Sequence, residues 1–84
     1  MKTADELIAS RKGAYLAVFD PYGAQTDIVM DDLAKFCRAN QSTFHPDARA
    51  HALMEGRREV YLRIQEHLTL TNEQLSKLYG AIHD

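Results

Sequence analysis

The side chains that could do chemistry include four histidines and a single cysteine, and their spacing does not suit a metal site. The histidines are His45, His51, His67 and His83, and none stands four residues from another. No two of them therefore share a helix face in the way that a pair of zinc ligands does. No second cysteine accompanies Cys37. We expect neither a metal nor a cofactor.

Cys37 is also a weak candidate for a nucleophile. It falls on an apolar helical stripe, where cysteines are commonly buried and unreactive. The sequence leaves a pairing of Cys37 with a histidine open, but no local motif supports one. The chain also lacks a glycine-rich phosphate-binding loop. We therefore expect a protein that is not an enzyme.

Three aspartates lie close together, at Asp27, Asp31 and Asp32. A cation site is one interpretation, but Asp31 stands four residues before Lys35, the spacing of an exposed ion pair on a helix. A solvated acidic face is the simpler reading. Asp32 flanks the apolar stripe of its helix, which makes it a candidate partner for a buried arginine elsewhere.

Length and composition indicate one small domain, residues 1–84. The net charge is −2 with 45% hydrophobic residues, and this balance gives no basic surface for nucleic acid. No apolar run approaches the roughly 18 residues that span a bilayer. The first residues lack the apolar core of a signal peptide. The single cysteine suits a reducing compartment, so we expect a cytoplasmic protein without membrane contact.

Apolar residues recur at helical spacing through the whole chain, which predicts an all-α fold. We expect a compact array of about four helices around a long central third helix, at residues 3–19, 27–38, 46–68 and 72–82. Thr3 with Glu6 and Thr71 with Gln74 form capping-box patterns at two helix starts. Asp20-Pro21-Tyr22-Gly23 predicts a turn between the first two helices.

The long helix has two unusual residues near its middle, Gly56 and Arg57. A mid-helix glycine costs about 1 kcal/mol relative to alanine, so we expect Gly56 to permit a close helix crossing. Arg57 falls on the apolar face. Because an unpaired buried charge is too costly, we expect Arg57 to be at least half buried and paired with a carboxylate, Asp32 or Asp20. An anion-binding role for Arg57 is the alternative.

Two leucines, Leu16 and Leu62, lie on otherwise outward helix faces, and Arg58 stands beside Leu62. These three residues are candidates for binding a partner. The competing interpretation is that both leucines are ordinary surface residues or lie under a neighbouring helix. The second and third helices could also imitate a helix-turn-helix, but the loop between them is longer than that motif uses.

Three segments together resemble one family. They are G-x-x-x-D-x-V-x-x-D-L-x-x-F-C-R-A from Gly23 to Ala39, S-T-F from Ser42 to Phe44, and E-G-R-R-E-V-x-L-R-I from Glu55 to Ile64. In this order they are similar to the Bbp-nineteen-like phage domain family, encoded among virion and morphogenesis genes of tailed phages. The resemblance covers about residues 15–70. It implies phage origin and supplies no catalytic residues.

The expected function follows from this resemblance and from the absence of catalytic spacing. We expect a small bacteriophage protein that acts by protein–protein contact, as a minor virion, assembly or genome-ejection component. It would lie in the host cytoplasm or be incorporated in the virion, and it could form a homo-oligomer. The alternatives are a host-takeover protein that inhibits a bacterial enzyme, and a DNA-binding regulator.

Overall fold

The protein is all-α in the computed structural model, which describes residues 3–80. Four helices follow one another, α1 (Ala4–Val18), α2 (Ala24–Phe36), α3 (Ala48–Thr69) and α4 (Asn72–Gly80), and the described part contains no strand. The predicted fold class and the dominant third helix are confirmed. Residues 81 and 82 of the predicted last helix, and His83, lie outside the described residues.

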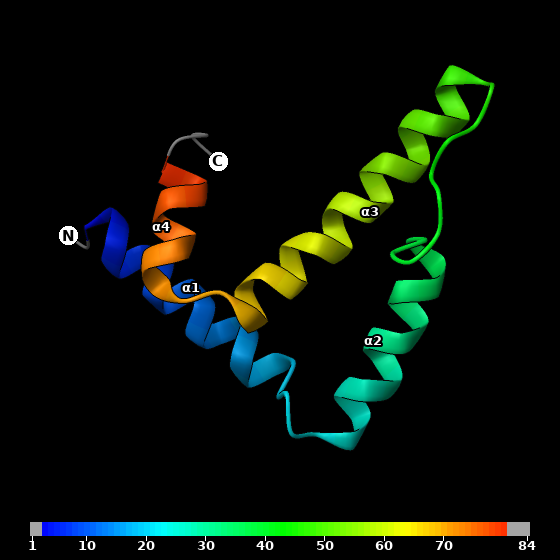
Figure 1. Cartoon of the computed structure of the whole chain (residues 1–84). Coiled ribbons are helices and arrows are strands. Elements are labelled where there is room, and N and C mark those ends of the chain that lie inside the picture. Colours follow the sequence, from blue (N-terminus) through cyan, green and yellow to red (C-terminus); the bar gives the residue numbers. More distant parts are fainter. Residues whose placement is uncertain (1–2, 81–84) are drawn as a thin grey trace.

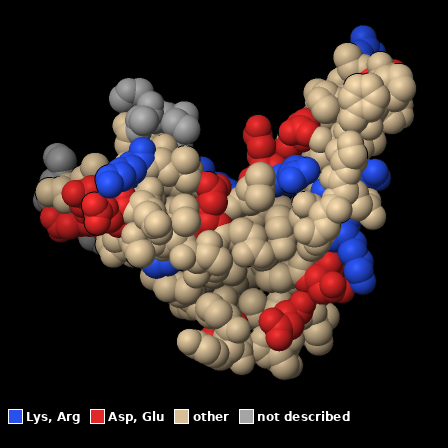
Figure 2. Space-filling model, in the orientation of Figure 1, with Lys and Arg blue, Asp and Glu red and all other residues tan. Residues whose placement is uncertain are grey.

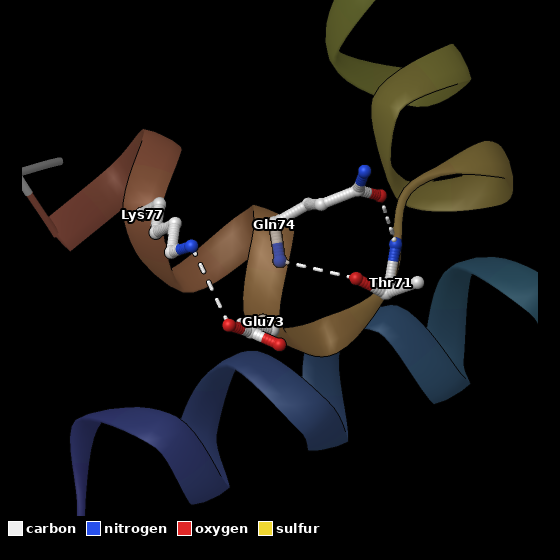
Figure 3. Close-up of polar contacts among 4 residues, drawn as sticks. All are labelled: Thr71, Glu73, Gln74 and Lys77. Carbon is white, nitrogen blue, oxygen red and sulfur yellow. Dashed lines mark hydrogen bonds and ion pairs between the residues drawn. The ribbon is translucent and has the colours of Figure 1, made fainter.

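The helix starts depend on short-range hydrogen bonds that the sequence encodes locally. The hydroxyl of Thr3 accepts from the backbone N–H of Glu6 at 3.2 Å, which confirms the first capping box. Thr71 and Gln74 form the second, with bonds of 3.1 and 2.9 Å in opposite directions (Figure 3). An exposed ion pair between Lys77 and Glu73, also drawn there, adds little stability.

The predicted starts of α2 and α3 are wrong by two to three residues. Helix α2 begins at Ala24, because the turn at Asp20 delivers Gly23 directly to the N-cap position and Thr26 lies inside the helix. Helix α3 begins at Ala48 rather than Pro46. Asp47 is the cap, since its carboxylate accepts from two backbone N–H groups of the first turn.

The four helices are arranged as two parts joined along α3 (Figure 1). At one end, α1 and α4 pack against each other and α1 packs on the C-terminal half of α3. At the other, α2 and the loop after it contact the N-terminal half of α3. The molecule measures 46 × 33 × 18 Å, so α3 projects well beyond the packed end.

His67, on the last turn of α3, is the centre of the packed end. Its side chain is fully buried. Its ring lies between the rings of Tyr15 of α1 and Tyr79 of α4, at centroid distances of 4.2 and 5.4 Å. Leu75 of α4 is equally buried. Three helices therefore meet around one imidazole.

Hydrogen bonds fix the orientation of that ring. Nδ1 donates to the backbone carbonyl of Arg63 at 2.7 Å, and Nε2 accepts from Nε of Arg11 at 2.9 Å. This pair of bonds requires the neutral imidazole with its proton on Nδ1. Lys12 donates to the backbone carbonyl of His67 at 2.9 Å, which satisfies an open carbonyl near the helix end and places positive charge there.

We predict that His67→Phe lowers the free energy of unfolding by about 1–3 kcal/mol, because the new ring keeps the stacking but leaves Nε of Arg11 without its acceptor. Urea denaturation followed by circular dichroism measures the change. Tyr22→Phe, which removes a polar atom from a side chain that is 97% exposed, is the control and should change stability by less than about 0.5 kcal/mol. Equal losses in the two variants would contradict the role given to His67.

Candidate interaction site

The joint between α2 and α3 begins with an unusual backbone conformation at Arg38. Its φ is 54°, in the left-handed region. The N–H of Ala39 donates to the carbonyl of Ala34 at 2.9 Å, and that of Arg38 to Lys35 at 3.2 Å, the pattern that ends many helices before a glycine. Here an arginine takes the glycine position. Nε of Arg38 then donates to the carbonyl of Ser42 at 3.0 Å and braces the loop.

Polar contacts tie this loop to α3. The hydroxyl of Thr43, a buried residue, donates to the carboxylate of Glu55. Nδ1 of His51 donates to the backbone carbonyl of Thr43 at 2.9 Å. Arg58 reaches the carbonyl of Gln41 at 3.4 Å. These bonds hold the loop along α3 and set where α2 stands relative to it.

Arg57 does not occupy the buried site that we predicted. It is exposed, and its guanidinium lies over the ring of Phe36, 4.5 Å from the centroid. Within residues 3–80 no ion pair joins it to Asp32 or Asp20, and both of those aspartates are exposed. The predicted apolar stripe is present on α3, but α1 and α4 cover only its C-terminal half. Burial of Arg57 was therefore a wrong prediction.

The expected close crossing at Gly56 is also wrong. A Cβ built on Gly56 would meet no atom within 4 Å. Helix α2 reaches this turn of α3 through the contact of Phe36 with Arg57, but no described residue stands against Gly56. Within a single copy of the chain, Gly56 is a helix position without a packing role.

The three residues predicted to bind a partner do not form one surface. Leu62 is 42% exposed and lines a groove between α3 and α4. Arg58 is partly buried, because it faces the loop at Gln41. Leu16 is partly buried on α1 and lines neither of the grooves described below. Leu62 alone keeps the exposed position expected of it.

Two apolar grooves flank the middle of α3. The α1–α3 groove encloses about 430 Å³, and its lining is Ala14, Tyr15, Val18, Phe19, Val60, Arg63 and Ile64. The α3–α4 groove encloses about 500 Å³ and includes Leu62, Leu78 and Tyr79. Val60 and Arg63 belong to both. In Figure 2, uncharged side chains cover most of the middle of the molecule, and acidic side chains gather at the N-terminal end of α1 and along α2.

Large apolar side chains are exposed far more often than they are buried. Among residues 3–80, only Cys37, Ile64 and Leu75 are buried hydrophobic residues. Ten large ones are exposed: Leu7, Val18, Tyr22, Ile28, Val29, Phe36, Phe44, Leu53, Val60 and Leu62. Other large apolar side chains are partly buried, but the exposed ones still outnumber the fully buried ones.

No three histidine, cysteine or acidic side chains of residues 3–80 converge as metal ligands. Tyr79 has a raised pKa, first because burial disfavours the phenolate and then because Glu66 is near. Its hydroxyl, 3.2 Å from Glu66, is therefore a donor at neutral pH. None of the helices between residues 3 and 80 has the length and apolar character needed to cross a membrane.

The segments that carried the family resemblance meet at the joint just described. Phe36 contacts Arg57, Arg38 contacts Ser42, and Thr43 contacts Glu55. The family described as Bbp19-like phage protein matches residues 15–79. The chain belongs to this family. It is a phage protein. No curated protein and no solved structure matches the chain.

Sequence reasoning about this family member missed His67 and Arg38. His67 lies one turn after Ile64 on the same face, and Arg11 lies on the apolar face of the first helix, so a polar pair between the two helices could have been considered. The left-handed conformation of Arg38 had no such signal, because arginine is not a residue that favours positive φ.

We predict that Gly56→Ala raises the free energy of unfolding by up to about 1 kcal/mol, because alanine has the higher helix propensity and the added methyl group meets no atom. Gly13→Ala is the matched control, since Gly13 is also mid-helix with open space around it. Thermal unfolding at one fixed protein concentration compares the two. A destabilised Gly56→Ala beside a stabilised Gly13→Ala would mean that a neighbour crosses α3 at this turn.

We also predict that Arg38→Ala is less stable than Arg38→Gly by about 1 kcal/mol. Both variants lose the bond to Ser42, but only glycine adopts a φ of 54° without strain. Chemical denaturation of the two proteins measures the difference. If alanine proved the more stable substitution, the left-handed conformation at position 38 would be wrong.

Proposed function

We propose that this phage protein acts by binding another protein and catalyses no reaction. Its setting is that of a minor virion, assembly or genome-ejection component, present in the host cytoplasm or incorporated in the particle. The observation that carries the proposal is the surface, where ten large apolar side chains are exposed and three are buried among the described residues. Such a surface favours a partner over solvent.

The α3–α4 groove is the surface that we assign to this partner. Its lining combines the apolar side chains of Leu62, Leu78 and Tyr79 with the charged groups of Glu59, Glu66 and Arg63. An apolar centre with a polar rim is the usual anatomy of a protein interface. Its two walls are joined, because the hydroxyl of Tyr79 on α4 donates to Glu66 on α3 and the ring of Tyr79 stacks on His67.

The joint between α2 and α3 argues against a DNA-reading role for α3. Arg57 lies on Phe36 and Arg58 reaches toward Gln41, so two of the arginines of this helix already contact the chain itself. The net charge of −2 gives no field that would attract a duplex. Affinity for phosphates would need several free cations on one face.

We predict that Leu62→Glu lowers the amount of the protein recovered with purified phage particles by at least about tenfold, because a charge would enter the apolar groove. Quantitative mass spectrometry of particles made with each variant measures it. Leu7→Glu is the matched control, an equal change at an exposed leucine outside both grooves, and should leave recovery unchanged.

Other outcomes would identify the alternatives. A protein absent from particles but captured with a bacterial enzyme from infected cells would indicate a host-takeover factor. A titration with duplex DNA near physiological salt is the second arm. Sub-micromolar binding with a steep salt dependence would contradict the proposal, since that result requires several phosphate contacts.

A further inference from the structure

The chain exposes more surface than a folded monomer of its size. Its accessible area is 6195 Å². A compact monomer of 9.5 kDa would expose about 5,000 Å², so the excess is roughly 1,100 Å². The radius of gyration agrees, at 14.7 Å against about 12 Å for a compact chain of this length. A stable protein interface buries about 800 Å² on each partner, so the excess matches one interface.

Exposed apolar side chains of three helices lie near one another, with Arg57 between those of α2 and those of α1 and α3. Val18 of α1 is 74% exposed and faces Val60 of α3, 60% exposed, across the α1–α3 groove. One turn before Val60, Arg57 covers Phe36 of α2, which is itself 58% exposed. Val29 stands two turns before Phe36 on the same stripe. We call these residues the inner face.

Two exposed charges of opposite sign stand at the inner face, one on α2 and one on α3, and Arg63 lines the groove between Val18 and Val60. Asp32 lies next to Phe36 on α2, and Arg57 lies on α3. Both are exposed, and within residues 3–80 neither forms an ion pair. When two copies of such a surface are related by a two-fold axis, the acid of each copy can lie opposite the base of the other.

We propose that the inner face is the interface of a two-fold homodimer, in which Asp32 of each protomer pairs with Arg57 of its partner. The excess exposed area is large enough for one interface of standard size. The opposite charges of Asp32 and Arg57 favour a second copy of this chain as the partner, because an unrelated protein need not carry matching charges. Three buried apolar residues stabilise a fold only weakly, so further apolar burial is needed once the chain folds. A second copy of the same chain is available to supply that burial. The dimer would form whether or not the protein enters particles.

The first test is the mass in solution, by light scattering on a sizing column from about 5 to 500 μM. We expect twice the chain mass of 9.5 kDa. Val18→Glu and Phe36→Glu should each weaken dimerisation at least about tenfold, because both introduce a charge on the inner face. Circular dichroism checks the fold, which Phe36→Glu should preserve because the new carboxylate faces Arg57. Leu62→Glu is the control and should remain a dimer, because Leu62 is not part of the inner face, although Val60 also lines the α3–α4 groove.

The second test separates pairing between chains from pairing within one chain. Each single variant, Asp32→Lys or Arg57→Glu, would bring two like charges together at both contacts of a two-fold homodimer. Each variant alone should therefore be a monomer. A mixture of the two variants should form a heterodimer, because both contacts then join opposite charges. Native mass spectrometry resolves the three species. A mixture that remains monomeric would overturn the two-fold arrangement.

Two results of the first test would also overturn the proposal. One is a parent protein that stays monomeric at 500 μM, which would leave the inner face to an unrelated partner. The other is a dimer that Leu62→Glu dissociates and Val18→Glu does not. The two proposals can fail independently. A dimer that is absent from phage particles would contradict only the particle-binding role, and a monomer that is found in particles would contradict only the homodimer.

Discussion

The arrangement of the helices depends on one buried imidazole. His67 has no exposed surface, and it is held by a bond from Arg11, a bond to the carbonyl of Arg63, and stacking against Tyr15 and Tyr79. An apolar side chain of similar size could fill the volume, but it would leave Nε of Arg11 without this acceptor. A polar group thus specifies how α1, α3 and α4 meet in a chain whose apolar core is too small to specify it alone.

That constraint acts at one end of a long element. At 1.5 Å per residue, the 22 residues of α3 span about 33 Å, and α1 and α4 cover only the C-terminal half. The other half is supported by α2 and the loop from Cys37 to Asp47. Its stripe continues the buried stripe but stays largely exposed, because Leu53 and Val60 are more than half exposed and Arg57 only covers Phe36 of α2. The same periodicity therefore yields a core at one end and an exposed apolar surface at the other.

This division explains what the sequence could and could not predict. The capping boxes at Thr3 and Thr71 are local, so four residues are enough to recognise each one. The stripe on α3 was also recognised correctly, because periodicity is a local property. Burial of Arg57 and Gly56 was not predictable, since a helical pattern reports which face is apolar and not what lies against it. Arg38 and His67 depend on contacts between separate segments, which no local rule describes.

The segments that carry the family resemblance lie mainly at the joint and not in the packed end. Arg38 ends α2 in a conformation that arginine rarely adopts, and its bond to Ser42 keeps the loop compact. Thr43 and Glu55 then fasten that loop to α3. These contacts contribute little apolar burial, so their physical effect is to fix the angle between α2 and α3. That angle sets the separation of Phe36 and Val60, and hence the shape of the exposed apolar surface between α2 and α3.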